Sequence, residues 1–326
     1  MLMPKISIII PMYKTEAYLE KCLRSVLGGD FKDIEVILVN DGSPSGHECS
    51  KYAEEDPRVK VIHQENKGVA AARNEGLRHA AAPYIGFVDS DDWIHPHMYQ
   101  QLYRLAKEHT ADIVSCGMLE YVNGEPKKKN CKPLGTDAPQ EIMNGTKALK
   151  RSLLSHPTAY SVVWDKLFAR HLFDEISFPE GRVSGEDAAV TYKLYHKANR
   201  IVHTHTAYYA YVIRNQSVTN KMFSASAMHK LDTAIEAVEY VNTHVPALSH
   251  HAKCFEIITA LRLAAYFDKP TQKQYPAEYA KTNQILSNAD KHAKALLPRR
   301  HKILLMLYKF CKPAFFAVWR RRLKAA

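Results

Sequence analysis

Three carboxylates lie within four residues at Asp89-Ser90-Asp91-Asp92, directly after the apolar residues 85–88. Charges this close repel one another unless a cation or hydrogen-bond donors compensate them. Hard cations such as Mg²⁺ or Mn²⁺ bind carboxylate oxygens together with substrate phosphates, and stabilise charge on a departing diphosphate. The segment therefore predicts a metal and phosphate site. The alternative is an acidic turn in which Asp91 or Asp92 caps the next helix.

A second acidic pair, Glu186-Asp187, precedes a helical pattern over residues 188–195. A carboxylate in a cleft that faces a phosphate-bearing substrate is a competent general base for a hydroxyl nucleophile. The alternative is that Asp187 only caps the helix. Further along, Arg214 and Ser217 lie close in sequence, and an arginine binds phosphate oxygens through a bidentate fork. A surface arginine on a loop is the alternative there.

The elements that must position these residues alternate along the first 115 residues. Apolar runs separated by helical patterns of 10–15 residues imply βαβ units and a mainly parallel sheet. We expect an α/β, Rossmann-like sheet flanked by helices, with Thr15 as the cap of the first helix. The expected strands are 6–10, 35–39, 59–63, 84–88 and 112–117, and the expected helices are 15–27, 45–55, 69–82 and 95–109.

In an open α/β sheet, ligands bind at the carboxyl ends of the strands. Polar or acidic groups follow four of the predicted strands, at residues 11–13, 41–43, 66–68 and 89–92. Asp41 could accept a hydrogen bond from a base or ribose, or could form an Asx turn with the two residues that follow it. The four segments together predict one ligand-binding crevice.

Gly68 opens an alanine-rich helix that carries Arg73 and Asn74 in its first two turns, which suits an anionic ligand. A simple helix start with a surface arginine is the alternative. The chain has neither G-x-G-x-x-G nor G-x-x-x-x-G-K-S/T, which disfavours a dinucleotide-binding fold and a P-loop enzyme.

The rest of the chain predicts a polar loop over 120–140, and then mixed structure up to about residue 220. This comprises helices over 141–154 and 187–198, a segment at 162–168, and strands at 201–203 and 208–212. From Ser224 onward the pattern is helical. We therefore expect a mixed α/β domain over residues 1–220 and a helical region over 221–326.

The 326 residues carry a net charge of +11, much of it in the C-terminal third. Apolar and aromatic residues over 303–318, flanked by Lys and Arg, are typical of a helix in an anionic membrane interface, with a break at Pro313. A packed helix with a solvated basic tail is the alternative. This placement favours an anionic membrane surface over nucleic acid. Six scattered cysteines without a secretory signal predict reduced thiols in the cytoplasm, and no segment is long enough to span a membrane.

Seven segments together resemble the family 2 glycosyltransferases of bacteria, which have the GT-A fold. The resemblance covers roughly residues 4–220, with the segments in the family's order. They read ISIIIPMYKTEAYLEKCLRSVL, DIEVILVNDGSPSG, VIHQENKGVAAARNEGLRHA, YIGFVDSDDWIHPHMY, VVWDKLFAR, GEDAAVTYKLY and YVIRNQSVTN.

The resemblance implies a role for each matching position. Asp89 and Asp91 match the D-x-D pair, with Asp89, beside Ser90, towards the ribose and Asp91 on a Mn²⁺ or Mg²⁺ ion. Asp187, in the E-D pair with Glu186, matches the base that deprotonates the acceptor. The remaining matches are Pro11, Tyr13 and Glu16 beside the nucleotide base, Asp41 on uracil, Lys67 and Arg73 near base and phosphates, Arg214 and Ser217 in a loop over the diphosphate, and Trp164 and Lys166 on the acceptor side.

Two positions depart from the family pattern, since Val212 stands where an arginine is common and Gln216 where a glycine is usual. The resemblance implies an inverting transfer from a UDP-sugar to a saccharide acceptor, often lipid-linked, at the inner face of the cell membrane. One base and one stabilised leaving group suffice for in-line attack. The alternatives are a nucleotidyltransferase, which usually needs a glycine-rich phosphate loop, and a non-catalytic nucleotide-sugar or membrane-binding module.

Overall fold

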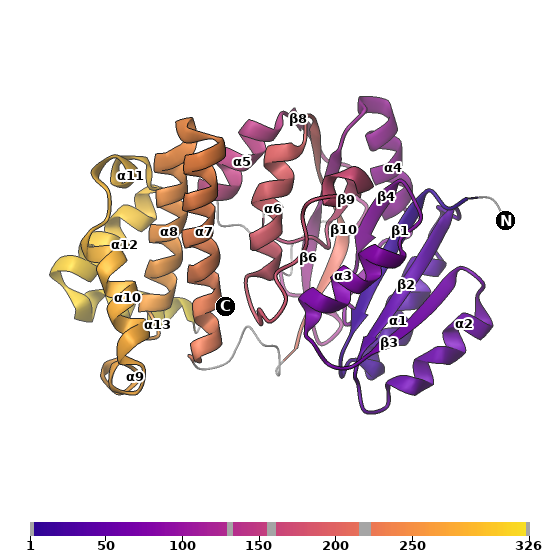
Figure 1. Ribbon diagram of the computed structural model, residues 1–326, viewed down its shortest axis with the longest axis horizontal. Coiled ribbons are helices and arrows are strands. Elements are labelled where there is room, and N and C mark those ends of the chain that lie inside the picture. The colour runs from indigo at the N-terminus through magenta and orange to yellow at the C-terminus, as the bar shows by residue number, and fades with distance from the viewer. Residues whose placement is uncertain (1–2, 129–132, 155–160, 215–222, 324–326) are drawn as a thin grey trace. The chain divides into compact units, whose positions relative to one another are not determined.

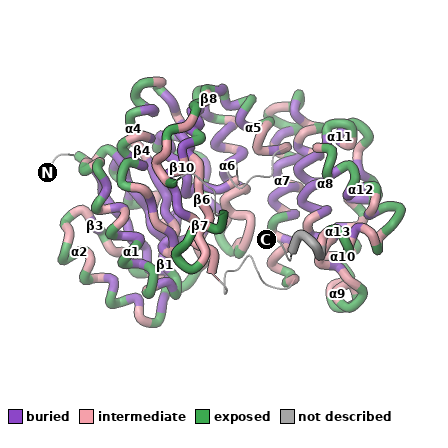
Figure 2. The backbone as a smooth tube through the Cα atoms, turned by 180° about the vertical axis from the view of Figure 1, so that it is seen from behind, coloured by how far each residue is buried: buried purple, intermediate pink, exposed green. Residues whose placement is uncertain are grey.

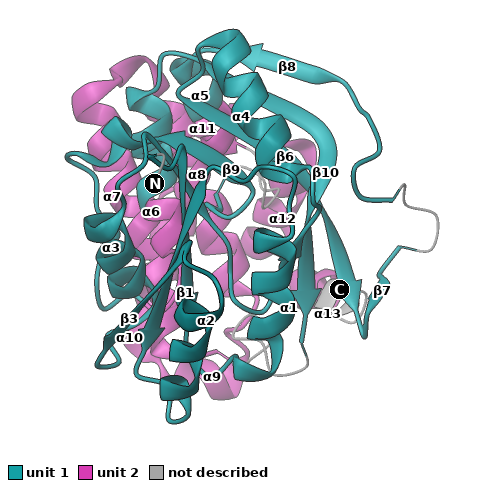
Figure 3. Cartoon of the chain, turned by 90° about the vertical axis from the view of Figure 1, so that its right-hand side faces the viewer, with its two compact units in different colours: residues 1–149, 157–182, 190–219 teal, residues 150–156, 183–189, 220–326 magenta. Residues whose placement is uncertain are grey.

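A computed structural model describes residues 3–128, 133–154, 161–214 and 223–323. The chain divides into two compact units, each with its own hydrophobic core (Figure 3). The first unit is Met1–Leu149, Pro157–Arg182 and Val190–Thr219; the second is Lys150–His156, Val183–Ala189 and Asn220–Ala326. The second unit thus takes in two short stretches from the predicted N-terminal domain.

The first half of the first unit alternates strands and helices, as the sequence predicts. Its strands lie in the order β3-β2-β1-β4 and pair in parallel. Strands β1 and β2 are buried along their whole length, as strands with covered faces are. The elements are β1 (Ile6–Met12), α1 (Glu16–Leu27), β2 (Ile34–Asp41), the short helix η1 (Gly46–Ser50), α2 (Lys51–Glu55), β3 (Val59–Gln64), α3 (Val69–His79) and β4 (Tyr84–Phe87) (Figure 1).

The sheet continues as β9-β6-β10-β5 and is mixed from this point. Strand β9 runs antiparallel to both β4 and β6, whereas β10 is parallel to β6. Pairing is therefore all parallel in the first half, whereas the second half combines the parallel pair β6-β10 with antiparallel neighbours. The elements are β5 (Trp93–Ile94), α4 (Met98–His109), β6 (Ile113–Val122), β7 (Glu125–Pro126), β8 (Gln140–Met143), α5 (Gly145–Leu154), β9 (Lys166–Ala169), η3 (Arg170–Phe173), α6 (Glu186–Lys197) and β10 (Ile201–Ile213).

Two local predictions differ from the structure. The predicted strands at 201–203 and 208–212 are one strand, β10. It stays paired with β6 on both sides of two register irregularities, which lie between His203 and Tyr209. The predicted loop at 120–140 contains the end of β6 and the short strand β7, and the start of the predicted helix at 141 is the strand β8. Both short strands pair with a longer neighbour, a tertiary effect that overrides local pattern.

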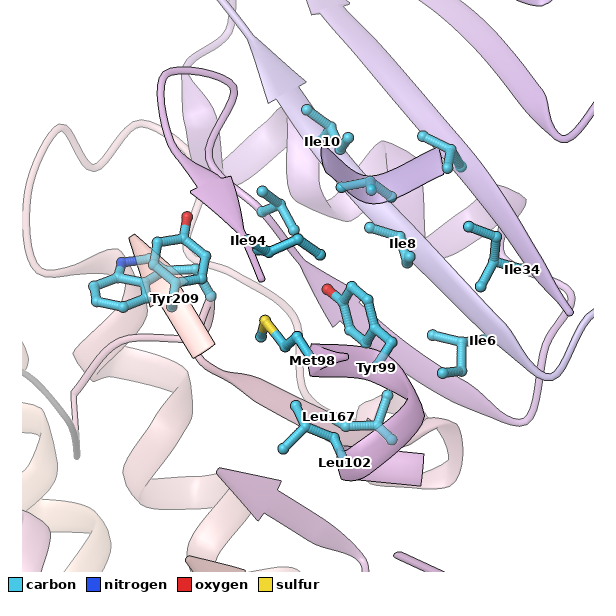
Figure 4. Close-up of a cluster of buried hydrophobic side chains, with 14 of the residues drawn as sticks. Ile6, Ile8, Ile10, Ile34, Ile94, Met98, Tyr99, Leu102, Leu167 and Tyr209 are labelled. Atoms are coloured by element: carbon cyan, nitrogen blue, oxygen red, sulfur yellow. The ribbon is translucent and has the colours of Figure 1, made fainter. Parts of the chain in front are cut away.

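The core of the first unit lies on both faces of the sheet. Ile6, Ile8 and Ile10 of β1 point to one face, where they lie in one cluster with side chains of α4 (Figure 4). Side chains of α1 belong to the same cluster. On the other face, Gly76 of α3 lies against Ile9, where a Cβ atom would meet the Ile9 side chain at 2.4 Å. Alternate residues of one strand thus hold helices on opposite faces of the sheet.

The second unit is helical beyond residue 223, as predicted. Helix α8 is its centre, with 11 of its 16 residues buried, and other helices of the unit pack around it (Figure 2). Pro313 does mark a break, since α12 ends at Phe310. The elements are η5 (Ala225–Met228), α7 (His229–His244), η6 (Pro246–Leu248), α8 (Ser249–Ala264), α9 (Lys269–Gln274), α10 (Pro276–Ser287), α11 (Lys291–Leu296), α12 (Arg299–Phe310) and α13 (Lys312–Leu323). Within the described ranges, every helix is too short or too polar to cross a bilayer.

The cysteines that the structure describes are free thiols. Burial raises the pKa of Cys49 and of Cys254 to about 11, and raises the pKa of Cys22 and of Cys116 as well. Cys311, between α12 and α13, is exposed. The four buried thiols behave as small apolar groups.

Candidate functional site

The acidic turn, residues 89–92, connects the end of β4 to β5. Val88 still donates its N–H to Ile9 of β1 at 3.1 Å, and Asp92 N–H then donates to Asp89 O at 3.0 Å, which tightens the chain into a turn. The alternative of a helix cap at Asp91 or Asp92 is wrong, because the next helix, α4, begins at Met98 after the strand β5. The turn therefore lies at the carboxyl end of a parallel strand.

Asp89 pairs with Arg73 of α3. The Arg73 Nη2 atom lies 3.0 Å from Asp89 Oδ1, and the residue is only 2% exposed. Its guanidinium also lies over the Phe178 ring, at 5.4 Å from the centroid. The alternative of a surface arginine at a simple helix start is therefore wrong. A buried arginine holds this carboxylate in a defined orientation.

Asp91 pairs with Arg214, which follows directly after β10. The Arg214 guanidinium also lies over the Tyr18 ring of α1, at 5.1 Å from the centroid. Burial and the charge of Asp89 raise the pKa of Asp91, and Arg214 partly opposes this. The turn thus holds more negative charge than its surroundings favour, which is a property of a site that takes a cation.

Asp92 has a different function from its two neighbours, and the sequence reasoning missed it. Its carboxylate accepts from the Tyr209 hydroxyl at 2.8 Å and from Val212 N–H at 2.7 Å. The same hydroxyl accepts from Asp89 N–H at 3.1 Å. Burial and the charges of Asp89 and Asp91 raise the pKa of Asp92. Asp92 and Tyr209 therefore fix the acidic turn to β10.

Ser90 is buried and shares a hydrogen bond of 2.7 Å with the Thr15 hydroxyl. Thr15 does occupy the cap position of α1, but its side chain makes no capping hydrogen bond. The position of the predicted cap is therefore right, but the predicted capping hydrogen bond is absent. The Thr15 hydroxyl bonds to Ser90 instead and so connects the segment after β1 to the acidic turn. The segments after β1 and β4 are joined in this way.

Asp41 organises the segment that follows β3. Its Oδ1 atom accepts from the Gln64 side chain at 2.6 Å and from Lys67 N–H at 2.9 Å, while Oδ2 accepts from Gly68 N–H at 2.8 Å. Ser43 N–H donates to Asn40 Oδ1 rather than to Asp41. A carboxylate has about four lone-pair sites, so Oδ2 keeps one for a further donor.

The residues after β1 are fixed in part by the segment after β2. Lys14 N–H donates to Ser43 Oγ at 2.8 Å, and Ser45 Oγ donates to Glu16 at 3.1 Å. Pro11 is buried in β1, whereas Tyr13 is 43% exposed and presents its ring to solvent beside Lys14. An exposed ring at a strand end is a suitable surface for stacking a base.

Trp164 and Lys166 are both buried. Trp164 stacks on Tyr209 at 4.3 Å and on Tyr211 at 5.6 Å between ring centroids. Lys166 has no exposed surface, forms an ion pair with Asp165 and donates to Val162 O at 2.9 Å. Burial raises the pKa of Asp165 to about 6 despite this lysine. Any role of Lys166 towards an acceptor is therefore indirect, through the segment that carries Trp164.

Glu186 and Asp187 begin α6 and belong to the second unit. Gly185, just before them, has φ +80°, and its carbonyl accepts from the Thr233 hydroxyl of α7 at 3.2 Å. Ser184 Oγ donates to Ser226 O, and Val183 N–H to His229 Nδ1. Several hydrogen bonds thus fix the candidate base segment on the helical unit. Ser217 lies outside the described residues.

The structure brings together Asp89, Ser90, Asp91, Arg73 and Arg214, with Asp41 and Lys67 on neighbouring strand ends. No three His, Cys, Asp or Glu side chains form a ready metal site within the described ranges. Two carboxylates nevertheless fit Mg²⁺ or Mn²⁺, because proteins hold Mg²⁺ through one or two carboxylates while substrate phosphates complete the set. The excess negative charge at Asp91 is consistent with that donor set.

Comparison with known proteins identifies similar chains. The family model described as "Glycosyl transferase family 2" matches residues 7–176. The chain is 30% identical to glycosyltransferase GlyA of Streptococcus pneumoniae, in a match that covers 90% of this chain. It is 34% identical to the uncharacterised glycosyltransferase EpsJ of Bacillus subtilis, in a match that covers 67% of this chain. These matches span 43% of GlyA and 64% of EpsJ, so the chain covers less than two thirds of either relative.

Among solved structures, TarS 1–349 of S. aureus in complex with UDP-GlcNAc is similar to the chain. The match has a TM-score of 0.70 and 21% identity, and covers 96% of this chain and 89% of the other. At this identity the likeness concerns the fold. The predicted GT-A architecture, a mixed α/β sheet flanked by helices with a helical C-terminal region, is confirmed.

Proposed function

Because the chain belongs to glycosyl transferase family 2, we propose that it is an inverting glycosyltransferase that moves one sugar from a UDP-sugar to an acceptor hydroxyl. The observation that carries the proposal is the acidic turn at the end of β4, where Asp89 and Asp91 are paired with Arg73 and Arg214. These cationic groups and carboxylates are suited to a nucleoside diphosphate and its metal. The binding of UDP-GlcNAc by TarS is consistent with a UDP donor.

In the proposed donor complex, Asp41 accepts a hydrogen bond from the uracil through its remaining lone pair. Tyr13 stacks on the base, with Pro11 and Glu16 shaping the same edge and Lys67 and Arg73 beside the base and phosphates. Asp89 and Ser90 orient the ribose. Arg214 neutralises the diphosphate, which gains charge as the sugar departs, and Ser217 donates a hydrogen bond to it.

Asp91, with Asp89, would hold a divalent ion, and family 2 enzymes commonly use one. Mn²⁺ and Mg²⁺ both suit oxygen ligands of this kind. The ion, when bound, neutralises charge on the departing diphosphate. Binding of the base and ribose and deprotonation of the acceptor are carried out by side chains of this chain.

The acceptor hydroxyl loses its proton to Asp187, with Glu186 beside it, while its oxygen attacks the anomeric carbon from the side opposite the diphosphate. One displacement of this kind inverts the anomeric centre. We propose a domain division at residue 220, with the donor held by residues 1–220 and the acceptor approached by residues 221–326. Trp164 contributes to the acceptor side, and Lys166 supports its position.

We further propose that the acceptor is a lipid-linked saccharide in surface polysaccharide, capsule or lipooligosaccharide synthesis. The enzyme would then work at the inner face of the cell membrane. Its excess of positive charge in the C-terminal region supports an anionic membrane partner rather than nucleic acid.

The test is release of UDP from a panel of UDP-sugars with Mn²⁺, followed by Asp187→Asn with the best donor. We expect this variant to lose turnover while it keeps its affinity for UDP, because the base does not hold the nucleotide. Glu239→Gln, an exposed change on α7, is the matched control and should leave turnover unchanged. Turnover at the normal rate in Asp187→Asn would refute the base assignment, and turnover of only GDP- or dTDP-sugars would refute the UDP assignment.

A further inference from the structure

Helix α12 has two faces of different character. His301, Leu304, Leu305 and Tyr308 are buried against the second unit. Ile303, Met306 and Phe310 are exposed instead, by 46%, 53% and 84%. These three residues follow one another at spacings of three and four, which puts them on one side of a helix.

Basic side chains border this apolar stripe. Arg299, Arg300, Lys302 and Lys309 are all exposed, and α12 contains no Asp or Glu. Helical geometry puts Arg300 on one side of the stripe and Lys302 and Lys309 on the other. The outward face of α12 is thus the set Arg299, Arg300, Lys302, Ile303, Met306, Lys309 and Phe310.

The net positive charge of the chain lies in the stretch of sequence that contains α12. Eleven Lys and Arg residues and no Asp or Glu follow Asp290, a number equal to the net charge of the whole chain. Residues 1–290 are therefore balanced in formal charge. The outward face has no acidic neighbour along the chain that could compensate it.

We propose that the outward face of α12 docks on an anionic lipid bilayer, with the helix axis in the plane of the interface. Ile303, Met306 and Phe310 enter the boundary between headgroups and acyl chains, while the flanking Lys and Arg contact lipid phosphates. An apolar stripe between cationic flanks is complementary to this partner and to few others. The inference rests on the proposed function only in taking the acceptor to be held in a membrane.

The direct test is co-sedimentation of the full chain with vesicles of equimolar phosphatidylcholine and phosphatidylglycerol, against vesicles of phosphatidylcholine alone. We expect binding to the anionic vesicles only. Raising the salt from about 0.1 M to about 1 M should weaken it, because the Debye length falls from about 10 Å to about 3 Å. Absence of binding to anionic vesicles at low salt would overturn the proposal.

Two variants separate the apolar and the charged parts of the face. Ile303→Ser/Met306→Ser/Phe310→Ser should lower the vesicle partition coefficient by about tenfold or more. Arg299→Glu/Arg300→Glu should lower it by about tenfold or more as well, and acidic residues in the first turn are compatible with helix α12. The matched control is Lys269→Glu/Lys273→Glu on the exposed helix α9, which should bind like the unchanged chain.

Two further readouts distinguish the outcomes. If the apolar variant binds vesicles normally but turns a dimer into a monomer in light scattering, the face is a contact with a second copy and the proposal is wrong. Acceptor-free release of UDP should be equal in all these variants, since none touches the donor site. If the unchanged chain releases UDP but does not bind anionic vesicles, only the docking proposal is refuted. If the unchanged chain binds these vesicles but turns over no sugar donor, only the proposed function is refuted.

Discussion

The first unit contains two groups of buried charge that are built in opposite ways. The sealed pair, Asp165 and Lys166, consists of adjacent residues with no exposed surface. The partners of the acidic turn, residues 89–92, come from α3, from β10 and from the residue just after β10. The carboxylates of Asp89 and Asp91 are partly exposed. The sealed pair has one carboxylate and one cationic side chain, while the turn has three carboxylates and two arginine partners. An unequal count with solvent access is what distinguishes a candidate ligand site from a structural ion pair.

Removing the lysine of the sealed pair should have the largest effect. In Lys166→Met, Asp165 is left buried without its cation, so we expect a loss of about 3–5 kcal/mol in the free energy of unfolding. Urea titration followed by circular dichroism measures it. Lys197→Met removes the exposed bridge to Glu175 and should cost less than about 1 kcal/mol. Equal effects in the two variants would mean that the sealed pair is no more structural than a surface bridge.

Neutralising one carboxylate of the acidic turn should act on activity and spare stability. Asp91→Asn removes a proposed metal ligand, and we expect UDP release to fall by about 100-fold, which corresponds to about 2.7 kcal/mol. The urea midpoint should change little, because the lost pair with Arg214 is offset by less repulsion from Asp89. Asp232→Asn, at the exposed bridge to Lys281, is the control. A large fall in stability with normal activity would make the acidic turn a structural group like the sealed pair.

A smaller effect should follow from loosening the turn without changing its charge. Tyr209→Phe removes the hydroxyl that bridges Asp89 N–H and Asp92, while Val212 N–H still contacts Asp92. We expect the KM for the donor to rise about tenfold with a smaller change in kcat, because the turn is less well positioned. Tyr103→Phe, whose ring packs on Phe31 and Tyr84, serves as control. An unchanged KM in Tyr209→Phe would remove Tyr209 from the site.

The pH dependence of stability gives the most specific comparison. The pKa of Asp165 is raised from 3.8 to about 6 on folding, so the folded state favours the protonated carboxyl. The stabilisation from this group is present below the unfolded pKa and is lost as the pH rises through about 6. Relative to Asp165→Asn, the unchanged chain should therefore lose stability between about pH 4 and pH 6. Urea midpoints across that range check this, with Asp232→Asn expected to keep the slope of the unchanged chain.

The sequence predicted the acidic turn as a ligand site because its evidence is local. An apolar run, three carboxylates and a helical pattern all lie within a short window. The parallel half of the sheet was predictable for the same reason, since each strand is followed by its own helix. The strand ends that carry these polar residues could thus be located before any contact was known.

The partners of the turn were not predictable from one sequence. Tyr209 and Asp92 are 117 residues apart, and nothing in the pattern around Tyr209 distinguishes it from Tyr208 or Tyr211. The antiparallel strand β9 was also missed as such, because its direction depends on pairing with β4 and β6 rather than on its own residues. The burial of Lys166 was not predictable either, because only the tertiary structure excludes solvent from this side chain.

The distribution of thiols gives the chain a built-in labelling site. Thiolates rather than thiols react with maleimides, and Cys22, Cys49, Cys116 and Cys254 are both buried and raised in pKa. Cys311 follows directly after Phe310, the most exposed apolar residue of the α12 outward face. In a Cys131→Ser background, an environment-sensitive fluorophore would attach at Cys311. Its emission would then report directly whether the end of α12 enters a lipid phase, with no need to separate bound from free protein.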